Sequence, residues 1–364
     1  MDQVRLGIVG CGRISEAHGI AADRLGDSVR FTACADVNEE SARRFAHKFG
    51  SNSIYTDARD MMAKESLDGV VFATWPAQHR EQIQAAIDSG VRYILCEKAL
   101  ALTGAEAREM WLAATAAGVT LVEAFMYTHH PVIGELDKLV RREVSGAIDS
   151  IRSSFSMYAP DPEGGKETWR QRKETGGSVP YDRTCYPVNI LGRYADALPA
   201  QVYASGTISP SYGTITRLFG EVTYENGRVG LIETSNAAIF TQEVQITCAN
   251  RVYRLSTPFT LAGDATIFEY EALKFSHVRT IEHPVSSEYP LQDDLPSYQA
   301  YKPQLARFVK AVRGQSTPSP RLIDSVVNSY TLDALVESMT NNTIVRVGIP
   351  DDVRDAWHAS RSSN

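Results

Sequence analysis

Lys98 stands where a charged side chain could take part in chemistry. It follows Leu95-Cys96-Glu97 and therefore lies at the carboxyl end of a predicted strand, at the mouth of a sheet. An ammonium group in such a place can orient a substrate hydroxyl and lower the pKa of a neighbouring acid–base group. The alternative is a solvated lysine that closes a strand, and position alone does not separate the two.

A second candidate is a polar face within residues 176–189. Asp182, Tyr186 and Asn189 are spaced i, i+4 and i+7, which places them on one face of a helix. A free tyrosine titrates near pH 10, so a cation such as Lys98 would be needed to bring its pKa into a useful range. The alternative is a solvated helix face with a half-buried Tyr186.

The start of that predicted helix carries its own signals. Ser178 can cap it, and Pro180 falls in the first turn, where proline is tolerated. Pro187 lies inside the expected helix and leaves the register of the polar face open. The geometry of this candidate site therefore depends on how the helix accommodates a proline.

A glycine-rich turn near the N-terminus could hold the phosphates of a cofactor. An apolar run over residues 4–9 is followed by Gly10, Gly12 and an amphipathic stretch that starts at Ile14. A strand, a glycine turn and a helix in this order leave backbone N–H groups free at the positive end of the helix. Ser15 replaces the third glycine of the G-x-G-x-x-G pattern and is small enough for close packing. Plain packing is the alternative role for such a turn.

An acid at the end of the second predicted strand, residues 29–36, strengthens the cofactor interpretation. Asp36 lies at the separation, about 20 residues or more beyond the glycines, where a ribose-binding carboxylate is expected. It would hold the ribose hydroxyls and repel a 2′-phosphate. The sequence therefore favours NAD, with NADP as the alternative.

These candidates require a sheet that brings strand ends together. Strand and helix patterns alternate through residues 1–123, with strands expected at 69–74, 92–96 and 119–123 and helices at 39–48, 57–63, 77–89 and 103–117. Parallel strands need crossover connections, so the alternation predicts a doubly wound α/β Rossmann domain. A ligand should lie beyond the carboxyl ends of the strands, near Thr74, Trp75 and Glu97.

From residue 124 to residue 364 the patterns indicate a second, α+β domain. A helix is expected at 131–144, a strand at 150–158 and a polar loop at 160–177. Alternation dominates from residue 201 to about residue 283, and Asn226-Gly227 predicts a hairpin between 217–224 and 228–236. We therefore expect a large, mostly antiparallel open sheet. Helices at 298–312 and 323–339 end the chain and could pack back on the first domain.

Composition narrows the classes of partner. The chain has 364 residues, 43% hydrophobic content and a net charge of −7, which argues against nucleic acid or an anionic membrane as the main partner. No run reaches about 18 consecutive apolar residues and no leader pattern is visible, so we expect a cytoplasmic protein. The five cysteines are scattered and fit buried free thiols. His129 and His130 are neighbours, which rarely share a metal, so we expect no metal site.

Several motifs together resemble the Gfo/Idh/MocA oxidoreductases, and most closely their branch of dimeric dihydrodiol dehydrogenases, NADP-dependent xylose dehydrogenases and keto-sugar reductases. The resemblance implies hydride transfer between nicotinamide and a secondary or anomeric alcohol of a sugar, cyclitol or related diol. It also implies a homodimer or homotetramer. The motifs, in chain order, are Gly10-Cys11-Gly12-Arg13-Ile14, Cys96-Glu97-Lys98, Val122-Glu123-Ala124-Phe125-Met126-Tyr127, Trp169-Arg170, Gly176-Gly177 through Asp182, and Cys185-Tyr186-Pro187-Val188-Asn189.

The resemblance implies a role for each matching position. Tyr186 would exchange the hydroxyl proton, Lys98 would tune it and bind the substrate oxygen, and Asp182 would position either group. The cofactor would contact Gly10, Gly12, Arg13, Ile14, Asp36, Thr74, Trp75, His79, Glu97, Lys98, Glu123, Trp169 and Arg170. The sugar or polyol substrate would contact Lys98, Tyr127, His129, Tyr158, Asp182, Arg183 and Tyr186.

The chain departs from the family pattern at three places. Ala99 replaces the usual proline, so we expect Lys98 to be held less rigidly. Arg183-Thr184 replaces the end of an Asp-x-Gly motif, and these bulkier residues are expected to approach the site. Thr128 stands where an arginine is frequent. Two other functions stay open: glycoside elimination with transiently reduced bound NAD, and a non-catalytic dinucleotide-sensing regulatory protein.

Overall fold

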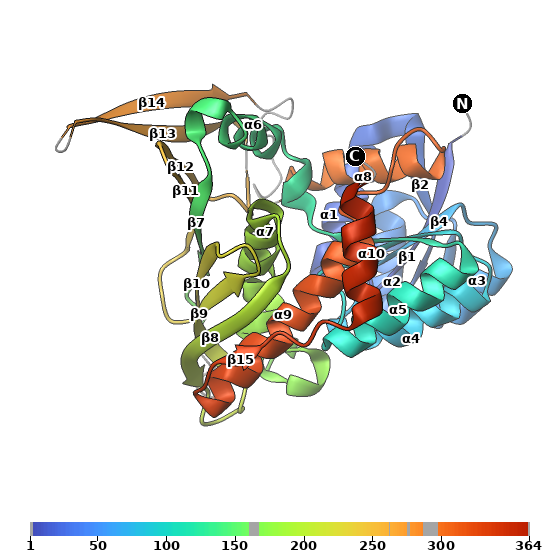
Figure 1. The fold of residues 1–364 in the computed structure, drawn as a ribbon. Helices are drawn as coiled ribbons and strands as arrows, with labels where there is room; N and C mark the ends of the chain where they lie inside the picture. The colour runs from blue at the N-terminus through green and yellow to red at the C-terminus, as the bar shows by residue number, and fades with distance from the viewer. Residues whose placement is uncertain (1–2, 160–166, 262, 275–276, 287–297, 363–364) are drawn as a thin grey trace.

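The computed structural model of the protein describes residues 3–159, 167–261, 263–274, 277–286 and 298–362. Within these ranges the chain forms a parallel sheet and a larger mixed sheet, with helices between them and on their faces (Figure 1). The polar loop expected at 160–177 lies partly outside the described residues, because these resume at residue 167.

The first sheet is parallel throughout and has the strand order β3-β2-β1-β4-β5-β6. The strand order reverses between β1 and β4, which is where sheets of this type bind ligands. Both faces are covered, so the strands are nearly continuous apolar runs. This confirms the predicted doubly wound sheet. Its strands are β1 (Val4–Val9), β2 (Val29–Ala35), β3 (Ser53–Tyr55), β4 (Gly69–Phe72), β5 (Tyr93–Glu97) and β6 (Thr120–Ala124).

The crossover helices begin and end on local sequence signals. The Thr103 hydroxyl accepts the Glu106 N–H at the start of α5, and Gly118 ends that helix with a φ of 63°. The Asn38 side chain caps α2 in the same way. The helices are α1 (Arg13–Leu25), α2 (Glu39–Phe49), α3 (Ala58–Lys64), α4 (Pro76–Asp88) and α5 (Gly104–Ala117).

The second sheet has the order β14-β13-β12-β11-β7-β10-β9-β8-β15 and is antiparallel except between β7 and β10. The predicted Asn226-Gly227 hairpin is confirmed: it joins β9 to β10, and Gly227 has a φ of +84°. The strands are β7 (Ile148–Ser156), β8 (Pro199–Ile208), β9 (Ile215–Tyr224), β10 (Val229–Ser235), β11 (Thr241–Cys248), β12 (Arg251–Ser256), β13 (Ala265–Lys274), β14 (His277–Val285) and β15 (Val345–Arg346).

The remaining helices connect the two sheets. Helix α7 (Cys185–Ala195) packs on β7 and β10, while α8 (Tyr301–Val312) contacts α1 and α9 (Leu322–Asn341) contacts α5 (Figure 1). The Asp333 carboxylate of α9 accepts the Gly104 N–H at the start of α5 at 2.7 Å. Short helical turns lie at η1 (Gly26–Ser28), η2 (Met126–His129), η3 (Glu143–Ser145), η4 (Trp169–Gln171) and η5 (Lys173–Thr175).

Two helices differ from the expected ranges. The helix expected at 131–144 ends earlier, as α6 (Pro131–Val140), and a further helix, α10 (Asp351–Ser362), follows the expected last one. Only Val353 and Trp357 of α10 are buried, so its apolar stripe is too narrow to stand out in the sequence. No helix in the described ranges is both long enough and apolar enough to cross a membrane.

Candidate active site

The glycine turn after β1 adopts a conformation that requires glycine. Gly10 has a φ of +87°, and a Cβ atom there would lie 2.8 Å from the Ala73 carbonyl oxygen. The Gly10 N–H donates to Ala35, which joins the turn to the end of β2. The Asp36 carboxylate accepts the Cys11 N–H at 2.7 Å and the Asn38 N–H at 2.8 Å. The predicted ribose-binding acid is therefore bonded to the glycine turn.

The N-terminus of α1 is open and fits the phosphates of a dinucleotide. A Cβ atom on Gly12 would meet nothing within 4 Å, and no side chain caps the first turn of the helix. Among the described residues, no side chain therefore occupies the positive end of the helix dipole as a cap for the N–H groups of that turn. Ser15 is fully buried, as expected for a small residue in close packing.

Lys98 and Asp182 are in contact although they lie 84 residues apart in the sequence. The Lys98 ammonium donates to the main-chain oxygen of Asp182 at 2.9 Å and to its carboxylate at 3.3 Å. The two side chains are 15% and 11% exposed. An ammonium has three N–H donors, so these bonds leave one for a further acceptor. Lys98 is thus held by Asp182 despite the alanine at position 99. The peptide bond between Lys98 and Ala99 is cis.

Asp182 is surrounded by positive charge. Besides Lys98, its carboxylate accepts a bond from Arg170 Nε at 2.8 Å, and Arg183 Nε lies 3.8 Å from the same oxygen. Burial alone would raise the pKa of this carboxyl group, but the three cations outweigh burial and hold the pKa below its usual range. Asp182 is therefore an ionised, immobilised carboxylate.

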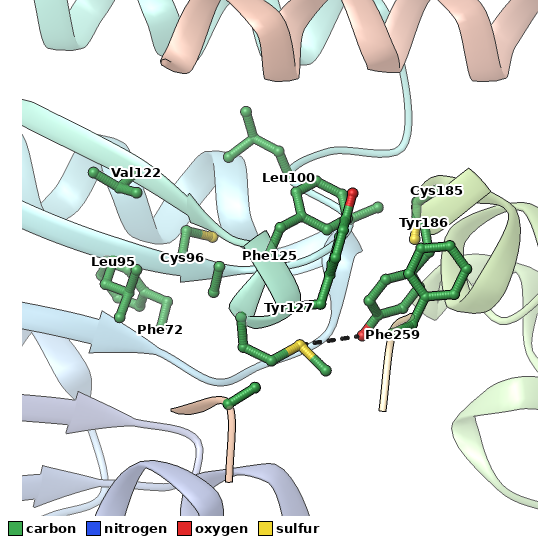
Figure 2. Packing of buried hydrophobic residues seen from close by; sticks show 14 of the residues in the cluster. Phe72, Leu95, Cys96, Leu100, Val122, Phe125, Tyr127, Cys185, Tyr186 and Phe259 are labelled. Carbon is green, nitrogen blue, oxygen red and sulfur yellow. Dashed lines mark hydrogen bonds between the residues drawn. The ribbon is translucent and has the colours of Figure 1, made fainter. Parts of the chain in front are cut away.

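Tyr186 lies beside Lys98, but its hydroxyl is bonded elsewhere. The Lys98 ammonium is 5.2 Å from the centre of the Tyr186 ring, while the hydroxyl donates to Met126 Sδ at 3.8 Å (Figure 2). The ring packs in an aromatic cluster, with Phe259 at 5.2 Å and Phe155 at 5.3 Å between ring centres. Burial raises the pKa of Tyr186 well above its usual value. The expectation that Lys98 lowers this pKa is therefore wrong, because the cluster excludes the water that would solvate a phenolate.

The segment that carries these groups is not a regular helix from its start. Residues Pro180–Thr184 form a π-helical turn, in which the Cys185 N–H reaches the Pro180 carbonyl, and α7 begins only at Cys185. Pro187 has no N–H to donate to the preceding turn, and a wider turn accommodates that loss. Ser178 does not cap the helix as predicted, because its hydroxyl bonds Ile215 of β9 instead.

Three expected cofactor contacts lie in the interior, where they support the Lys98 loop. The Glu97 carboxylate is bonded to His18 Nε2 at 2.9 Å, and the Glu123 carboxylate accepts the Leu100 N–H at 2.8 Å. His79 is fully buried, and its ring nitrogens face the main-chain oxygens of Thr74, Ala99 and Leu100. These side chains hold the loop in place from behind.

Some of the other predicted residues lie near Asp182 or on the surface, and the others are buried. Trp75 is 42% exposed at the start of α4, beside Thr74, and Trp169 packs against Arg170 near Asp182. Tyr127 is buried and its hydroxyl donates to Asn189. His129 belongs to η2, which packs on α8, and burial lowers its pKa to about 4. Tyr158 is exposed at the end of β7.

Arg183 does not project into the site as expected. It is 1% exposed, and its guanidinium donates to the main-chain oxygens of Met157 and Ser235 and to the Asn236 side chain. The Thr184 hydroxyl is bonded to that of Thr234. Both replacements therefore fasten the π-helical turn to the second sheet.

Sequence reasoning missed His18, which orients Glu97 from α1. His18 is fully buried and shares the inner face of that helix with Ser15 and Ala22. A histidine on an otherwise apolar helix face is a usable signal when an acid ends a neighbouring strand. It does not say which acid the histidine meets.

Comparison with known proteins agrees with this architecture. Residues 4–125 match the sequence model described as the Gfo/Idh/MocA oxidoreductase family, NAD-binding Rossmann fold, and residues 133–254 match the C-terminal domain model of the same family. An inositol 2-dehydrogenase/D-chiro-inositol 3-dehydrogenase of Shouchella clausii is 30% identical over 357 residues, or 95% of each chain. A D-xylose 1-dehydrogenase (NADP(+)) of Haloferax volcanii is 28% identical, over 86% of this chain and 91% of the relative.

The fold also matches a levoglucosan dehydrogenase solved with NADH and L-sorbose. The TM-score is 0.84 over 96% of this chain and 100% of that one, at 20% sequence identity. The likeness therefore extends to the second sheet as well as the parallel one. Taken with the two sequence models and the inositol dehydrogenase, it leads to one conclusion: the chain belongs to the Gfo/Idh/MocA family of oxidoreductases and has its NAD-binding Rossmann domain.

Proposed function

We propose that this oxidoreductase transfers a hydride between a nicotinamide dinucleotide and the CH–OH carbon of a sugar, cyclitol or related diol, with Lys98, Asp182 and Tyr186 around the reacting carbon. The observation that carries the proposal is the contact between Lys98 and Asp182. It brings a partly exposed ammonium from the Rossmann domain to an ionised carboxylate of the second domain. Such a pair can bind and orient a hydroxyl or carbonyl oxygen.

The cofactor would be held by the residues around the switch point of the parallel sheet. The free N–H groups after Gly12 would bind the pyrophosphate, with Arg13 and Ile14 in the same turn, and Asp36 would bind the ribose hydroxyls. Thr74 and Trp75 follow β4, which pairs with β5, the strand that precedes Lys98. The bound dinucleotide supplies the hydride donor or acceptor.

The side chains at the reacting end supply hydrogen bonds and a proton. The third N–H of Lys98 would donate to the substrate oxygen, while Asp182 keeps the ammonium in place. Tyr186 stays a neutral phenol because burial raises its pKa. Its present acceptor, the Met126 thioether, is weak, so a substrate carbonyl oxygen that replaced it would be a stronger acceptor for the O–H. A neutral phenol fits proton donation, which accompanies carbonyl reduction.

The substrate class is supported by the relatives. The matched proteins of Shouchella clausii and Haloferax volcanii are named as an inositol dehydrogenase and a D-xylose dehydrogenase. The test is a screen of aldoses, inositols and keto-sugars with NAD and NADP, following absorbance of the reduced cofactor. Turnover of at least one of these substrates is expected. Tightly co-purified cofactor without net NADH formation would favour glycoside elimination instead, and binding of dinucleotide with no chemistry would favour a sensor.

Tyr186→Phe tests the proton-donating role. We expect turnover to fall by about 100-fold, the usual contribution of a positioned acid–base group, with dinucleotide affinity nearly unchanged. Stopped-flow measurement of hydride transfer and a fluorescence titration with NADH separate the two quantities. Tyr224→Phe, at a buried tyrosine of β9, is the matched control. Equal turnover in Tyr186→Phe and the parent would remove the phenol from the mechanism.

Asp36→Ala tests the cofactor preference. Loss of the carboxylate removes both the ribose acceptor and the repulsion of a 2′-phosphate, so the ratio of kcat/KM for NAD over NADP should fall by about tenfold. Parallel assays with the two cofactors measure it. A parent enzyme that already prefers NADP would contradict the role given to Asp36.

We also propose that the Rossmann domain ends at residue 123 and that the chain assembles as a homodimer or homotetramer through the open face of the second sheet. Tyr203 of β8 and Phe219 of β9 are 43% and 38% exposed, which supports that face as the contact. Sedimentation analysis tests the assembly.

Five free cysteines fit a reducing, cytoplasmic compartment.

A further inference from the structure

An exposed apolar surface lies beside the candidate active site. Tyr158, Ile239 and Phe240 are 68%, 81% and 48% exposed, and we call these three side chains the apolar lip. Tyr158 follows β7, and the other two precede β11. Thr241 pairs with Ser156 in the sheet, so the two segments run next to each other. The lip is therefore one patch built from two neighbouring segments.

A row of aromatic rings connects the lip to Lys98. The ring of Phe240 lies 6.4 Å from that of Phe155, which lies 5.3 Å from that of Tyr186. The Lys98 ammonium is in turn 5.2 Å from the Tyr186 ring. Phe155 and Tyr186 are buried, so this row runs beneath the surface and places the lip and Lys98 at the two ends of one aromatic cluster.

The buried Arg183 side chain links the segments that carry the apolar lip to the π-helical turn that contains Asp182. Its guanidinium donates to Met157 at 3.4 Å and to Ser235 at 3.2 Å, and it also bonds the Asn236 side chain. Met157 directly precedes Tyr158, and Ser235 and Asn236 lie three to five residues before Ile239 and Phe240 in the chain. Arg183 follows Asp182 directly, so the segments carrying the lip and the carboxylate that holds Lys98 are tied to one guanidinium. The lip therefore has a fixed place relative to the reacting oxygen.

We propose that the apolar lip binds an aryl or alkyl aglycone attached to the sugar-like substrate, so that the enzyme acts on glycosides with an apolar substituent in preference to free sugars. This inference rests on the hydride-transfer function proposed above. A free sugar presents mainly hydroxyl groups and would leave the lip in water. Contact with an apolar aglycone would remove the apolar surface of the lip and that of the aglycone from water. Small-molecule sites are lined mostly by apolar side chains, with a few polar groups that fix the orientation of the ligand.

The test compares matched methyl and phenyl glycosides of glucose and xylose, in both anomeric forms. Binding to the NADH-loaded enzyme is measured by titration calorimetry, and turnover is measured with NAD. Covering the lip with a phenyl ring should make the phenyl glycoside bind about tenfold more tightly than the methyl glycoside. Phenyl and methyl glycosides that bind equally, or no detectable binding of any phenyl glycoside, would overturn the proposal.

Substitutions in the lip locate the effect. Phe240→Ser and Ile239→Ser should each reduce the phenyl advantage, and the double variant should reduce it to within about twofold. Ile344→Ser is the matched control, because Ile344 is 61% exposed but lies next to β15, separated from β7 by three strands of the sheet. A phenyl advantage that persists in the double variant would overturn the assignment of the lip.

Three further outcomes distinguish this inference from the proposed function on which it rests. A phenyl advantage that depends on the lip, together with no NAD-linked turnover of any sugar, polyol or glycoside, would support the lip and overturn the proposed function. A change in sedimentation coefficient in the lip variants, with the phenyl advantage intact, would show that the patch joins copies of the chain and would overturn the inference. Turnover of free sugars with no phenyl advantage would keep the function and remove the aglycone site.

Discussion

Two buried carboxyl groups flank the Lys98 loop and have opposite protonation behaviour. Asp182 faces Lys98, Arg170 and Arg183, and these cations hold its pKa below the usual range although burial opposes them. Glu123 is more deeply buried: one of its carboxylate oxygens accepts the Leu100 N–H, the other has no hydrogen-bond partner among the described residues, and burial raises its pKa to about 7. Both carboxyl groups are within the influence of the same ammonium.

The difference shows that burial alone does not set the charge of a carboxyl group. Asp182 is ionised because charged partners replace its lost hydration, whereas neutral donors replace only part of that of Glu123. One group therefore serves as a permanent counter-ion for Lys98. The other holds the loop from behind and changes its protonation near neutral pH.

Lys98→Met is expected to have the largest effect, because it removes the cation that acts on both carboxyl groups. We expect kcat/KM to fall by about 1000-fold, since the donor to the substrate oxygen is lost. Asp182 should stay ionised through Arg170 and Arg183. Steady-state kinetics measures the loss, and circular dichroism checks the fold. Lys48→Met, at an exposed lysine paired with Glu16, is the control, and activity within tenfold of the parent would exclude Lys98 from the site.

Glu123→Gln removes the titrating member of the pair but keeps an acceptor for the Leu100 N–H. The pKa of Glu123 is raised from 4.5 to about 7, so the native state binds the extra proton more tightly than the unfolded state. Its contribution to stability is complete below about pH 4.5 and is lost as the pH rises through about 7, a difference of roughly 3 kcal/mol.

Urea denaturation at several pH values between 5 and 8 measures this difference. The parent should lose stability toward pH 8 more steeply than the Gln variant. Identical pH dependence in the two proteins would mean that Glu123 does not titrate in this range, and the contrast drawn here between the two groups would fail.

Arg170→Met tests how much Arg170 contributes to holding Asp182, and it is expected to have the smallest effect. The Arg170 side chain is 39% exposed, so solvent screens its bond to Asp182, and its removal should cost well under about 1 kcal/mol of stability. KM should rise about threefold with little change in kcat, because Lys98 and Arg183 still hold the carboxylate. Arg170→Lys should restore most of the affinity. A loss as large as that of Lys98→Met would show that Arg170 touches the reacting groups.

The Rossmann domain could be predicted from sequence because its signals are local. Alternating apolar patterns, the Thr103 cap and the Gly118 helix end each act over a few residues, and the structure has all of them. The same holds for the Asn226-Gly227 hairpin. Helix α10 escaped prediction because two buried side chains make too weak a pattern.

The candidate site could be predicted only as a set of residues. Nothing in the spacing of Lys98 and Asp182 says that they meet, and the family resemblance alone placed them together. Arginine is usually exposed, whereas Arg183 is buried. Its burial depends on carbonyl groups at the ends of two strands that are far apart in the sequence. The direction of the Tyr186 hydroxyl is set by the packing of Phe155 and Phe259, which is a property of the folded core.

The bond between Asp36 and the Cys11 amide bears on any effort to re-engineer coenzyme use. The acid that would discriminate between the two coenzymes also supports the turn that would cradle their shared pyrophosphate. Replacing it to admit a 2′-phosphate would therefore weaken the grip on both coenzymes at once. A successful redesign would have to introduce a second acceptor for that amide, so specificity and affinity would need to be changed together.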